Sequence, residues 1–71
     1  MKIKSPRYFV WEGDIVNDTI CRYRVVLPDG KVDYYSRKGG DMYRAGPSVY
    51  DLDYLIQYLK EIPEQELVLL L

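Results

Sequence analysis

The chain has 71 residues, with ten Lys/Arg, eleven Asp/Glu, no histidine and 48% hydrophobic residues. A chain of this length buries only about 60% of its unfolded surface, so we predict one small domain, residues 1–71, with little room for a deep substrate cleft. The composition excludes a disordered tail, and the net charge of −1 argues against binding driven by positive charge alone.

The first half of the chain predicts three strands. Residues 7–12 are rich in aromatic and branched side chains and follow Pro6, which suits a strand start. Residues 17–27 end in an alternating pattern, and residues 28–30, Pro-Asp-Gly, form a turn that leads into a return strand at residues 31–36.

The alternation within residues 17–27 assigns side chains to the two faces of that strand. It places Arg22 and Arg24 on a solvated face and predicts a core face made of Cys21, Tyr23, Val25 and Leu27.

The second half predicts a loop, a helix and a last strand. Residues 37–47 contain three glycines and no periodicity, so we expect a mobile surface loop. Ser48 and Asp51 form a capping signal for a helix that Pro63 ends. Residues 64–71 finish in five consecutive apolar residues, which predicts a strand covered on both faces. The predicted fold is α+β, a mostly antiparallel sheet in the order βββαβ with one helix packed across it.

Tyrosine recurs every fourth residue in the predicted helix. At about 100° per residue the core side of the helix consists of Leu52, Leu55, Ile56 and Leu59, with Val49 and Ile62 at its margins. Tyr50 and Tyr54 lie close to opposite that side, and Tyr58 approaches its margin near Ile62; these three residues form what we call the tyrosine ridge. Because tyrosine is enriched at protein interfaces, the ridge predicts a partner-binding surface, to which the loop residues Tyr43 and Arg44 contribute. The alternative is a ridge covered by the chain itself, through its N-terminal segment, the long loop or a second layer.

Basic and aromatic residues around the hairpin give a second hypothesis. A nucleic-acid-binding module would stack bases and hold phosphates through Arg22, Arg24, Tyr35, Arg37 and Lys38. Tyr34, in the same hairpin, is a further candidate base-stacking residue. The acidic C-terminal part of the chain disfavours this role. It allows instead an imitation of nucleic acid by Asp51, Asp53, Glu61, Glu64 and Glu66, or a plain solvated face.

Catalysis has no support in the sequence. The chain lacks histidine, the usual general base, and Cys21 is expected to be an inert core residue. We therefore expect no enzyme, no cofactor and no metal site. With one cysteine and neither a signal peptide nor a membrane span, we expect a cytoplasmic protein.

The leading hypothesis is a small non-catalytic interaction protein. It would dock on a larger protein or protein complex and regulate or inhibit it, as small phage- or mobile-element-encoded proteins do to machinery in a host cytoplasm; this comparison is by analogy of size and composition. A nucleic-acid-binding module and a structural homo-oligomer, a homodimer in its simplest form, are the alternatives.

Overall fold

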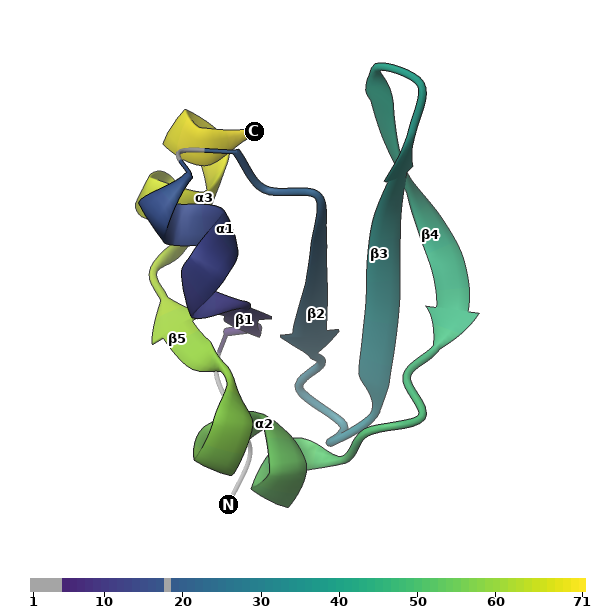
Figure 1. Cartoon of the computed structure of the whole chain (residues 1–71). Helices are drawn as coiled ribbons and strands as arrows, with labels where there is room; N and C mark the ends of the chain where they lie inside the picture. Colours follow the sequence, from purple (N-terminus) through teal and green to yellow (C-terminus); the bar gives the residue numbers. More distant parts are fainter. Residues whose placement is uncertain (1–4, 18) are drawn as a thin grey trace.

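The computed structural model describes residues 5–17 and 19–71. It is an α+β fold with a five-stranded sheet and three short helices within those residues (Figure 1). The elements in chain order are β1 (Arg7–Val10), α1 (Glu12–Val16), β2 (Arg22–Val26), β3 (Val32–Lys38), β4 (Asp41–Pro47), α2 (Leu52–Tyr58), β5 (Lys60–Ile62) and α3 (Glu64–Leu70).

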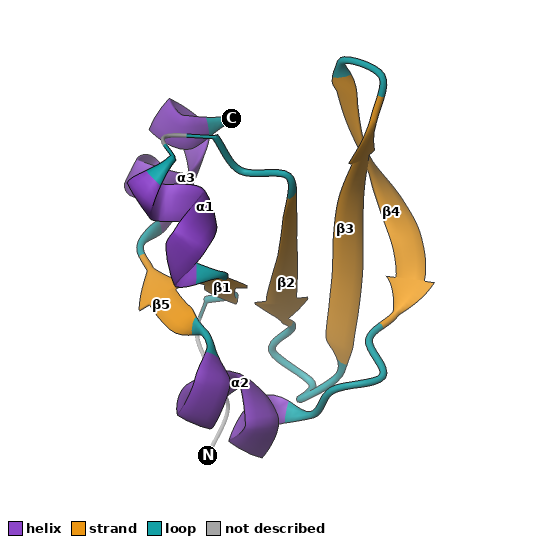
Figure 2. Cartoon of the chain, viewed as in Figure 1, coloured by secondary structure: helices purple, strands orange, loops and turns teal. Residues whose placement is uncertain are grey.

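The sheet has the strand order β4-β3-β2-β1-β5, and every neighbouring pair is antiparallel (Figure 2). This confirms the predicted class and the antiparallel sheet. The detailed order differs, because β4 and β5 are strands that the sequence did not predict, and α1 and α3 are additional helices. No helix in the described part of the chain is long and apolar enough to cross a membrane.

The hairpin between β2 and β3 is the one predicted from the Pro-Asp-Gly turn at residues 28–30. The Gly30 backbone N–H donates to the Leu27 carbonyl over 2.8 Å, and Gly30 has a φ of 91°, a conformation that glycine adopts without steric cost. Val26 then pairs with Val32, which places Arg24 opposite Tyr34.

The predicted loop at residues 37–47 is wrong. β3 continues to Lys38, the chain turns at Gly39 and Gly40, and β4 returns along β3. Alternating hydrophobicity is missing because β4 is an edge strand whose residues are mostly exposed. A bulge between Tyr34 and Tyr35 shifts the register of this pair.

The predicted helix is shorter at both ends. Asp51, and not Ser48, is the N-cap, and its carboxylate accepts a hydrogen bond from the Tyr54 backbone N–H over 3.0 Å. The helix ends at Tyr58, and the chain becomes extended to form β5 against β1. Pairing with the edge of β1 satisfies backbone groups that a longer helix would have satisfied internally.

The predicted C-terminal strand is also wrong, since these residues form α3. Pro63 is its N-cap, and the Leu67 backbone N–H donates to the Pro63 carbonyl. A run of apolar residues fits a buried strand or a buried helix face equally well. In α3 only Leu67 is fully buried, whereas Val68 and Leu69 are 62% and 85% exposed.

Two core clusters lie on opposite faces of the sheet, because successive residues of β1 point to opposite sides. The face that α2 covers, here called the α2 face, holds Phe9, Val26, Leu55 and Leu59. The other, here called the α3 face, holds Val10, Ile20, Ile62 and Leu67, with Ile15 of α1 packed against them. Figure 1 shows α1 and α3 close together at one end of the sheet and α2 at the other.

An ion pair joins β1 to β5, and we expect it to make the folding stability depend on pH. The Arg7 guanidinium donates two hydrogen bonds to Glu61, of 2.9 and 2.8 Å, and these lower the pKa of Glu61. A depressed folded-state pKa stabilises the fold above the unfolded pKa of about 4.3, and the contribution disappears as the pH falls through the lower folded value.

We expect Glu61→Gln to lower the free energy of unfolding at pH 7 by at most about 1 kcal/mol, since both side chains are partly exposed and screened. The loss of stability between about pH 5 and pH 3 should be shallower in the variant. Urea unfolding across this range measures both effects, with the exposed Glu66→Gln as the control. Identical pH profiles for wild type and Glu61→Gln would contradict this role.

Candidate binding surface around Arg24 and the tyrosine ridge

The tyrosine ridge is a continuous stack of rings. The Tyr50 and Tyr54 centroids are 4.0 Å apart with nearly parallel planes, and those of Tyr54 and Tyr58 are 4.6 Å apart and tilted by 41°. Tyr50 and Tyr54 are half-buried against the core of the α2 face, whereas Tyr58 is 56% exposed. The ridge therefore begins in the core and ends in solvent.

The core side of α2 is shifted from the predicted one, because Tyr50 and Tyr54, which were predicted to lie nearly opposite the core, pack against it. Leu55 and Leu59 are buried, as expected, but Ile56 is 56% exposed and Val49 is 88% exposed. The assignment of Ile56 to the core was wrong because α2 lies over one end of the sheet, and two tyrosine rings fill part of the space beneath it. The outer surface of α2 thus carries an exposed aliphatic residue in addition to Tyr58.

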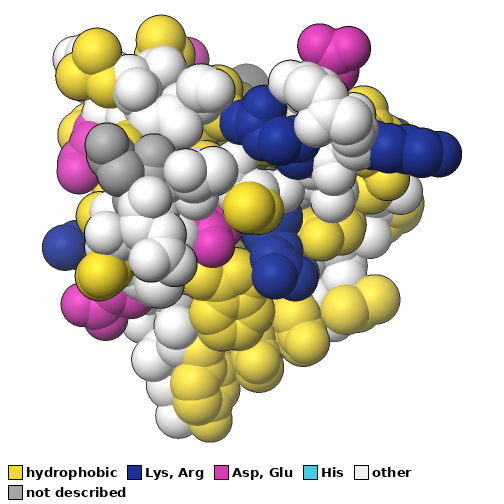
Figure 3. All heavy atoms as spheres, turned by 45° about the horizontal axis from the view of Figure 1, so that its top comes forward, with side chains coloured by type: hydrophobic (Ala, Val, Ile, Leu, Met, Phe, Trp, Pro, Cys, Tyr) yellow, Lys and Arg dark blue, Asp and Glu magenta, His cyan; other side chains and the backbone are white. Residues whose placement is uncertain are grey.

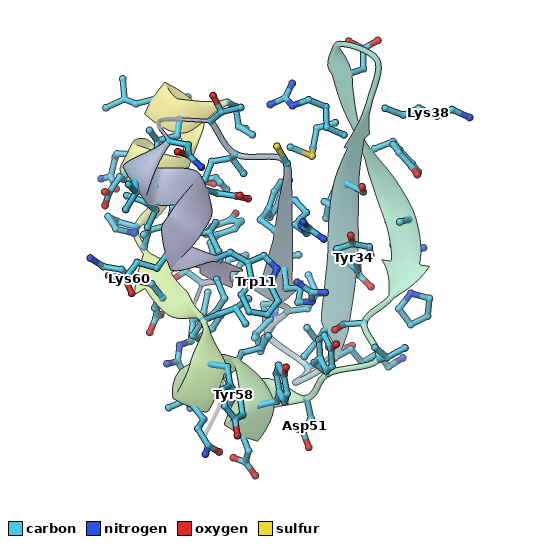
Figure 4. The ribbon with its side chains drawn as sticks, in the orientation of Figure 1. Trp11, Tyr34, Lys38, Asp51, Tyr58 and Lys60 are labelled. Carbon is cyan, nitrogen blue, oxygen red and sulfur yellow. The ribbon has the colours of Figure 1, made fainter. Side chains whose placement is uncertain are left out.

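Arg24 lies at the inner end of the ridge, inside a cage of aromatic rings. Its guanidinium carbon is 4.5 Å from the Tyr34 ring centroid, 5.0 Å from that of Tyr50 and 5.9 Å from that of Trp11. Each distance is within the range of a cation–π interaction. Figure 4 shows Trp11 and Tyr34 on the same side of the sheet, and Tyr58 farther out on α2.

The burial of Arg24 corrects the sequence analysis, which placed it on a solvated face. Arg24 is only 7% exposed. The alternation along β2 was read correctly, but the face that carries Arg24 is covered by Trp11, Tyr34 and Tyr50. Phosphate groups of a nucleic acid therefore have little access to this arginine.

The hydrogen-bonding capacity of Arg24 is largely unused. Within residues 5–17 and 19–71, its Nε and Nη1 atoms are enclosed and have no hydrogen-bond partner. Burial lowers the pKa of Arg24, and the nearby Arg22 lowers it further, against the opposing effect of Tyr34 and Tyr50. An arginine nevertheless stays charged at neutral pH. A buried cation without an acceptor is costly and requires an explanation.

The α2 face continues beyond the cage as an open surface. Arg22 pairs with Ser36 across the β2–β3 ladder, and Ser36 pairs with Tyr43 in β4, so these three side chains share the face of Arg24. Arg22 and Tyr43 are exposed. Basic side chains adjoin hydrophobic ones on the surface seen when the top of Figure 1 is turned forward (Figure 3).

The five residues predicted to bind nucleic acid are not brought together. Tyr35 lies on the α3 face, where its ring stacks on Tyr23 at 4.9 Å. Arg37 donates to the carbonyls of Ile20, Gly40 and Leu71, so it holds the structure together. Lys38 is exposed near the tip of the β3–β4 hairpin and extends away from the sheet (Figure 4).

The loop residues predicted to extend the ridge lie in β4, away from α2. Tyr43 is 45% exposed and lies near the hairpin end of the sheet, opposite to the end that α2 covers. Arg44 bonds to Asp33 over 2.9 Å on the α3 face, and this hydrogen bond lowers the pKa of Asp33. Neither residue forms a continuous surface with Tyr58.

Cys21 is exposed, which corrects its assignment to the core. It precedes β2, and its backbone N–H donates to the Asp14 carboxylate over 3.2 Å. This bond to α1 turns the chain before the strand alternation begins. Within the described ranges, no group of three or more Cys, Asp or Glu side chains is arranged to hold a metal ion.

A surface cavity of about 600 Å³ lies between the start of β1 and the β5–α3 connection. Four of its polar lining residues bond to one another, Arg7 to Glu61 and the Tyr8 hydroxyl to Glu64 over 3.0 Å. None of the residues of the Arg24 cage lines it. The cage and the ridge are thus separate from this cavity.

Neither Trp11 nor Tyr34 was predicted from the sequence to enclose Arg24, although Tyr34 was named with Arg24 as a candidate base-stacking residue. For Tyr34 a signal was present, because the Pro-Asp-Gly turn fixes the hairpin register and that register places Tyr34 opposite Arg24. For Trp11 no local signal existed. Its position depends on the end of β1 at Val10 and on the start of α1 at Glu12.

Tyr54 is half-buried, so its truncation is expected to lower the stability of the fold. We expect Tyr54→Ala to lower the free energy of unfolding by about 2 kcal/mol, because two aromatic contacts, each worth about 0.5–1.5 kcal/mol, are lost. Tyr58→Ala removes only one contact from an exposed ring and should cost less than about 1 kcal/mol. Urea unfolding compares the two variants, and equal costs would show that the Tyr54 ring is not packed as described.

No protein-family model, no curated protein and no solved structure matches the chain. In the part of the chain that the structure describes, the inner end of the ridge holds a caged guanidinium whose Nε and Nη1 lack a hydrogen-bond partner, and its outer end is the exposed Tyr58 ring.

Proposed function

We propose that the protein is a small non-catalytic interaction module that docks on a larger protein through α2 and thereby regulates or inhibits it. The observation that carries the proposal is the ring stack, which leads from the buried Arg24 to the exposed Tyr58. A stack anchored in the core holds Tyr58 in place before binding, so little side-chain entropy is lost on association.

The charges around the ridge indicate what kind of partner surface fits. Asp51 and Asp53 are exposed beside the tyrosines, and α2 has no basic residue in its last turn. A complementary partner presents an apolar pocket for Tyr58 with basic groups at its rim. The cytoplasm is the proposed setting, since the chain has a single cysteine and thus no internal disulfide.

The test is capture of partners from a nuclease-treated bacterial lysate with three tagged proteins: wild type, Tyr58→Ala and Val68→Ala. Val68 is 62% exposed on α3 and is the matched control for exposure. We expect one protein to be retained by the wild type and by Val68→Ala and lost by Tyr58→Ala. With the purified target, Tyr58→Ala should weaken binding at least tenfold, as truncation of an interface anchor does.

Circular dichroism and urea unfolding must show that Tyr58→Ala remains folded. Equal retention by all three proteins, or retention of none, would contradict docking through α2. Recovery of nucleic acid without nuclease, together with no retained protein, would support the nucleic-acid-binding alternative.

Self-association is a second candidate, and exposed apolar residues of α3 favour it. Val68, Leu69 and Leu71 are 62%, 85% and 49% exposed, and a second copy would remove them from water. Analytical ultracentrifugation over a range of concentrations tests this. A dimer that Leu69→Asp converts to monomer would establish the candidate, whereas a monomeric wild type would exclude it.

A further inference from the structure

We propose that Arg24 is the binding site for a carboxylate group, which enters the aromatic cage and hydrogen-bonds the guanidinium. The assignment of this carboxylate to an acidic side chain of the docked protein rests on the proposed function. Binding of a carboxylate as such rests only on the geometry of the cage.

The Arg24 guanidinium lacks hydrogen-bond acceptors within the described residues. The Arg24 side chain is buried, since the residue is only 7% exposed. Neither Nε nor Nη1 has a hydrogen-bond partner in the described ranges. Ring faces interact with the charge of a guanidinium, but its in-plane N–H groups still need acceptors. A carboxylate would supply them in its preferred bidentate geometry.

The shape of the guanidinium allows a bidentate pair. Nε and Nη1, the two nitrogens without a partner in the described ranges, each form one hydrogen-bonding edge together with Nη2. A carboxylate that bonds to Nη2 therefore also pairs with one of these two nitrogens.

A second positive charge, that of Arg22, lies close to Arg24. Arg22 lies two residues away on the same face of β2, close enough to lower the pKa of Arg24. Two cations of like charge on one face attract an anion, and the bound anion would relieve their repulsion. The hydroxyl of Ser36, opposite Arg22, is an additional donor on this face.

The size of the opening favours a carboxylate over a phosphodiester chain. Only a small part of Arg24 reaches the surface, which suits a single planar group. A polyanion gains affinity by neutralising many phosphates, but Arg37 is used in bonds to carbonyls, and Asp51 and Asp53 flank the ridge. These acids would repel a polyanion more strongly than a single carboxylate, because the repulsion grows with the charge of the ligand.

The experiment is a titration of the isolated protein with sodium acetate at neutral pH and constant ionic strength, with chloride as the balancing anion. Trp11 is the single tryptophan, and its ring lies beside Arg24, so its fluorescence reports on the cage. ¹⁵N-resolved NMR follows the Nε–H signal of Arg24 and the indole N–H of Trp11. We expect saturable changes in these signals and none at Arg7 or Arg44, whose guanidinium groups already bond to carboxylates.

Two variants, each of which lacks one positive charge, distinguish binding at Arg24 from an effect of the net charge of the protein. Arg24→Met should weaken acetate binding at least tenfold, and Lys38→Met, which removes an exposed cation elsewhere, should change it less than twofold. The wild-type NMR titration needs no variant and decides the question if Arg24→Met does not fold. A linear, non-saturable response at Arg24, or an equal loss in Lys38→Met, would overturn the proposal.

Inorganic phosphate, titrated in the same way, tests the class of anion. Tighter binding of phosphate than of acetate would overturn the assignment to a carboxylate. Failure of acetate binding with intact Tyr58-dependent capture would reject the carboxylate site alone. Acetate binding without any captured protein would keep the site and reject its assignment to a docked partner.

Discussion

Replacing Leu55 with alanine is expected to lower the free energy of unfolding by about 2–5 kcal/mol. Leu55 is fully buried and joins α2 to Phe9 and Val26 of the sheet. Truncation leaves a cavity that the rigid sheet below cannot fill. A domain of this size has a total stability of only about 4–10 kcal/mol, so the variant loses a large part of it.

Ile56→Ala is the matched control for this prediction. It lies next to Leu55 in the same helix but is 56% exposed, and its replacement should change stability by less than about 0.5–1 kcal/mol. Urea unfolding, followed by Trp11 fluorescence and by circular dichroism, measures both variants. A larger loss for Ile56→Ala than for Leu55→Ala would show that α2 is rotated from the orientation described.

On the opposite side of the sheet, Leu67→Ala is expected to lower the free energy of unfolding by about 2–4 kcal/mol. Leu67 is 3% exposed and packs with Val10, Ile20 and Ile62. It is the one fully buried residue of α3, so its removal weakens the attachment of the whole helix.

Leu69→Ala removes the same number of atoms from the same run of leucines. Leu69 is 85% exposed, and we expect a change in stability below about 0.5 kcal/mol at protein concentrations where the chain is monomeric. If these residues formed a strand, alternation would place Leu67 and Leu69 on the same face, and the two costs would be similar. Unequal costs therefore support the helix, and equal costs would contradict it.

Tyr58 and Arg24, at the two ends of the candidate surface, affect the stability of the fold differently. The exposed end, Tyr58, costs little stability and is free to bind. The buried end holds the Arg24 guanidinium, whose Nε and Nη1 have no partner among the described residues and whose desolvation opposes folding. Natural proteins keep such costly groups at functional sites, where stability is given up for binding. Arg24→Met is accordingly expected to leave stability unchanged or to raise it by about 1 kcal/mol, while carboxylate binding is lost.

Several features of this protein follow from local chemistry and were determined by the sequence alone. The Pro-Asp-Gly turn fixes the β2–β3 hairpin because proline restricts φ at the turn and glycine adopts the positive φ that the turn requires. The Ser48–Asp51 capping signal locates the start of α2 to within one turn, although the N-cap is Asp51, whose carboxylate accepts from the Tyr54 N–H, and not Ser48. Leu55 and Leu59 are buried because helical periodicity places both on one side. The α+β class and the antiparallel pairing follow from these elements.

Other features were decided only by the tertiary structure. The apolar C-terminal run suits a strand or a helix, and it is helical because one side of α3 covers Val10 and Ile62. β5 is extended because the edge of β1 offers it backbone partners. Alternation told which face Arg24 occupies, but not that Trp11, Tyr34 and Tyr50 enclose it there. Burial and pairing depend on residues distant in the chain, and local sequence patterns do not contain that information.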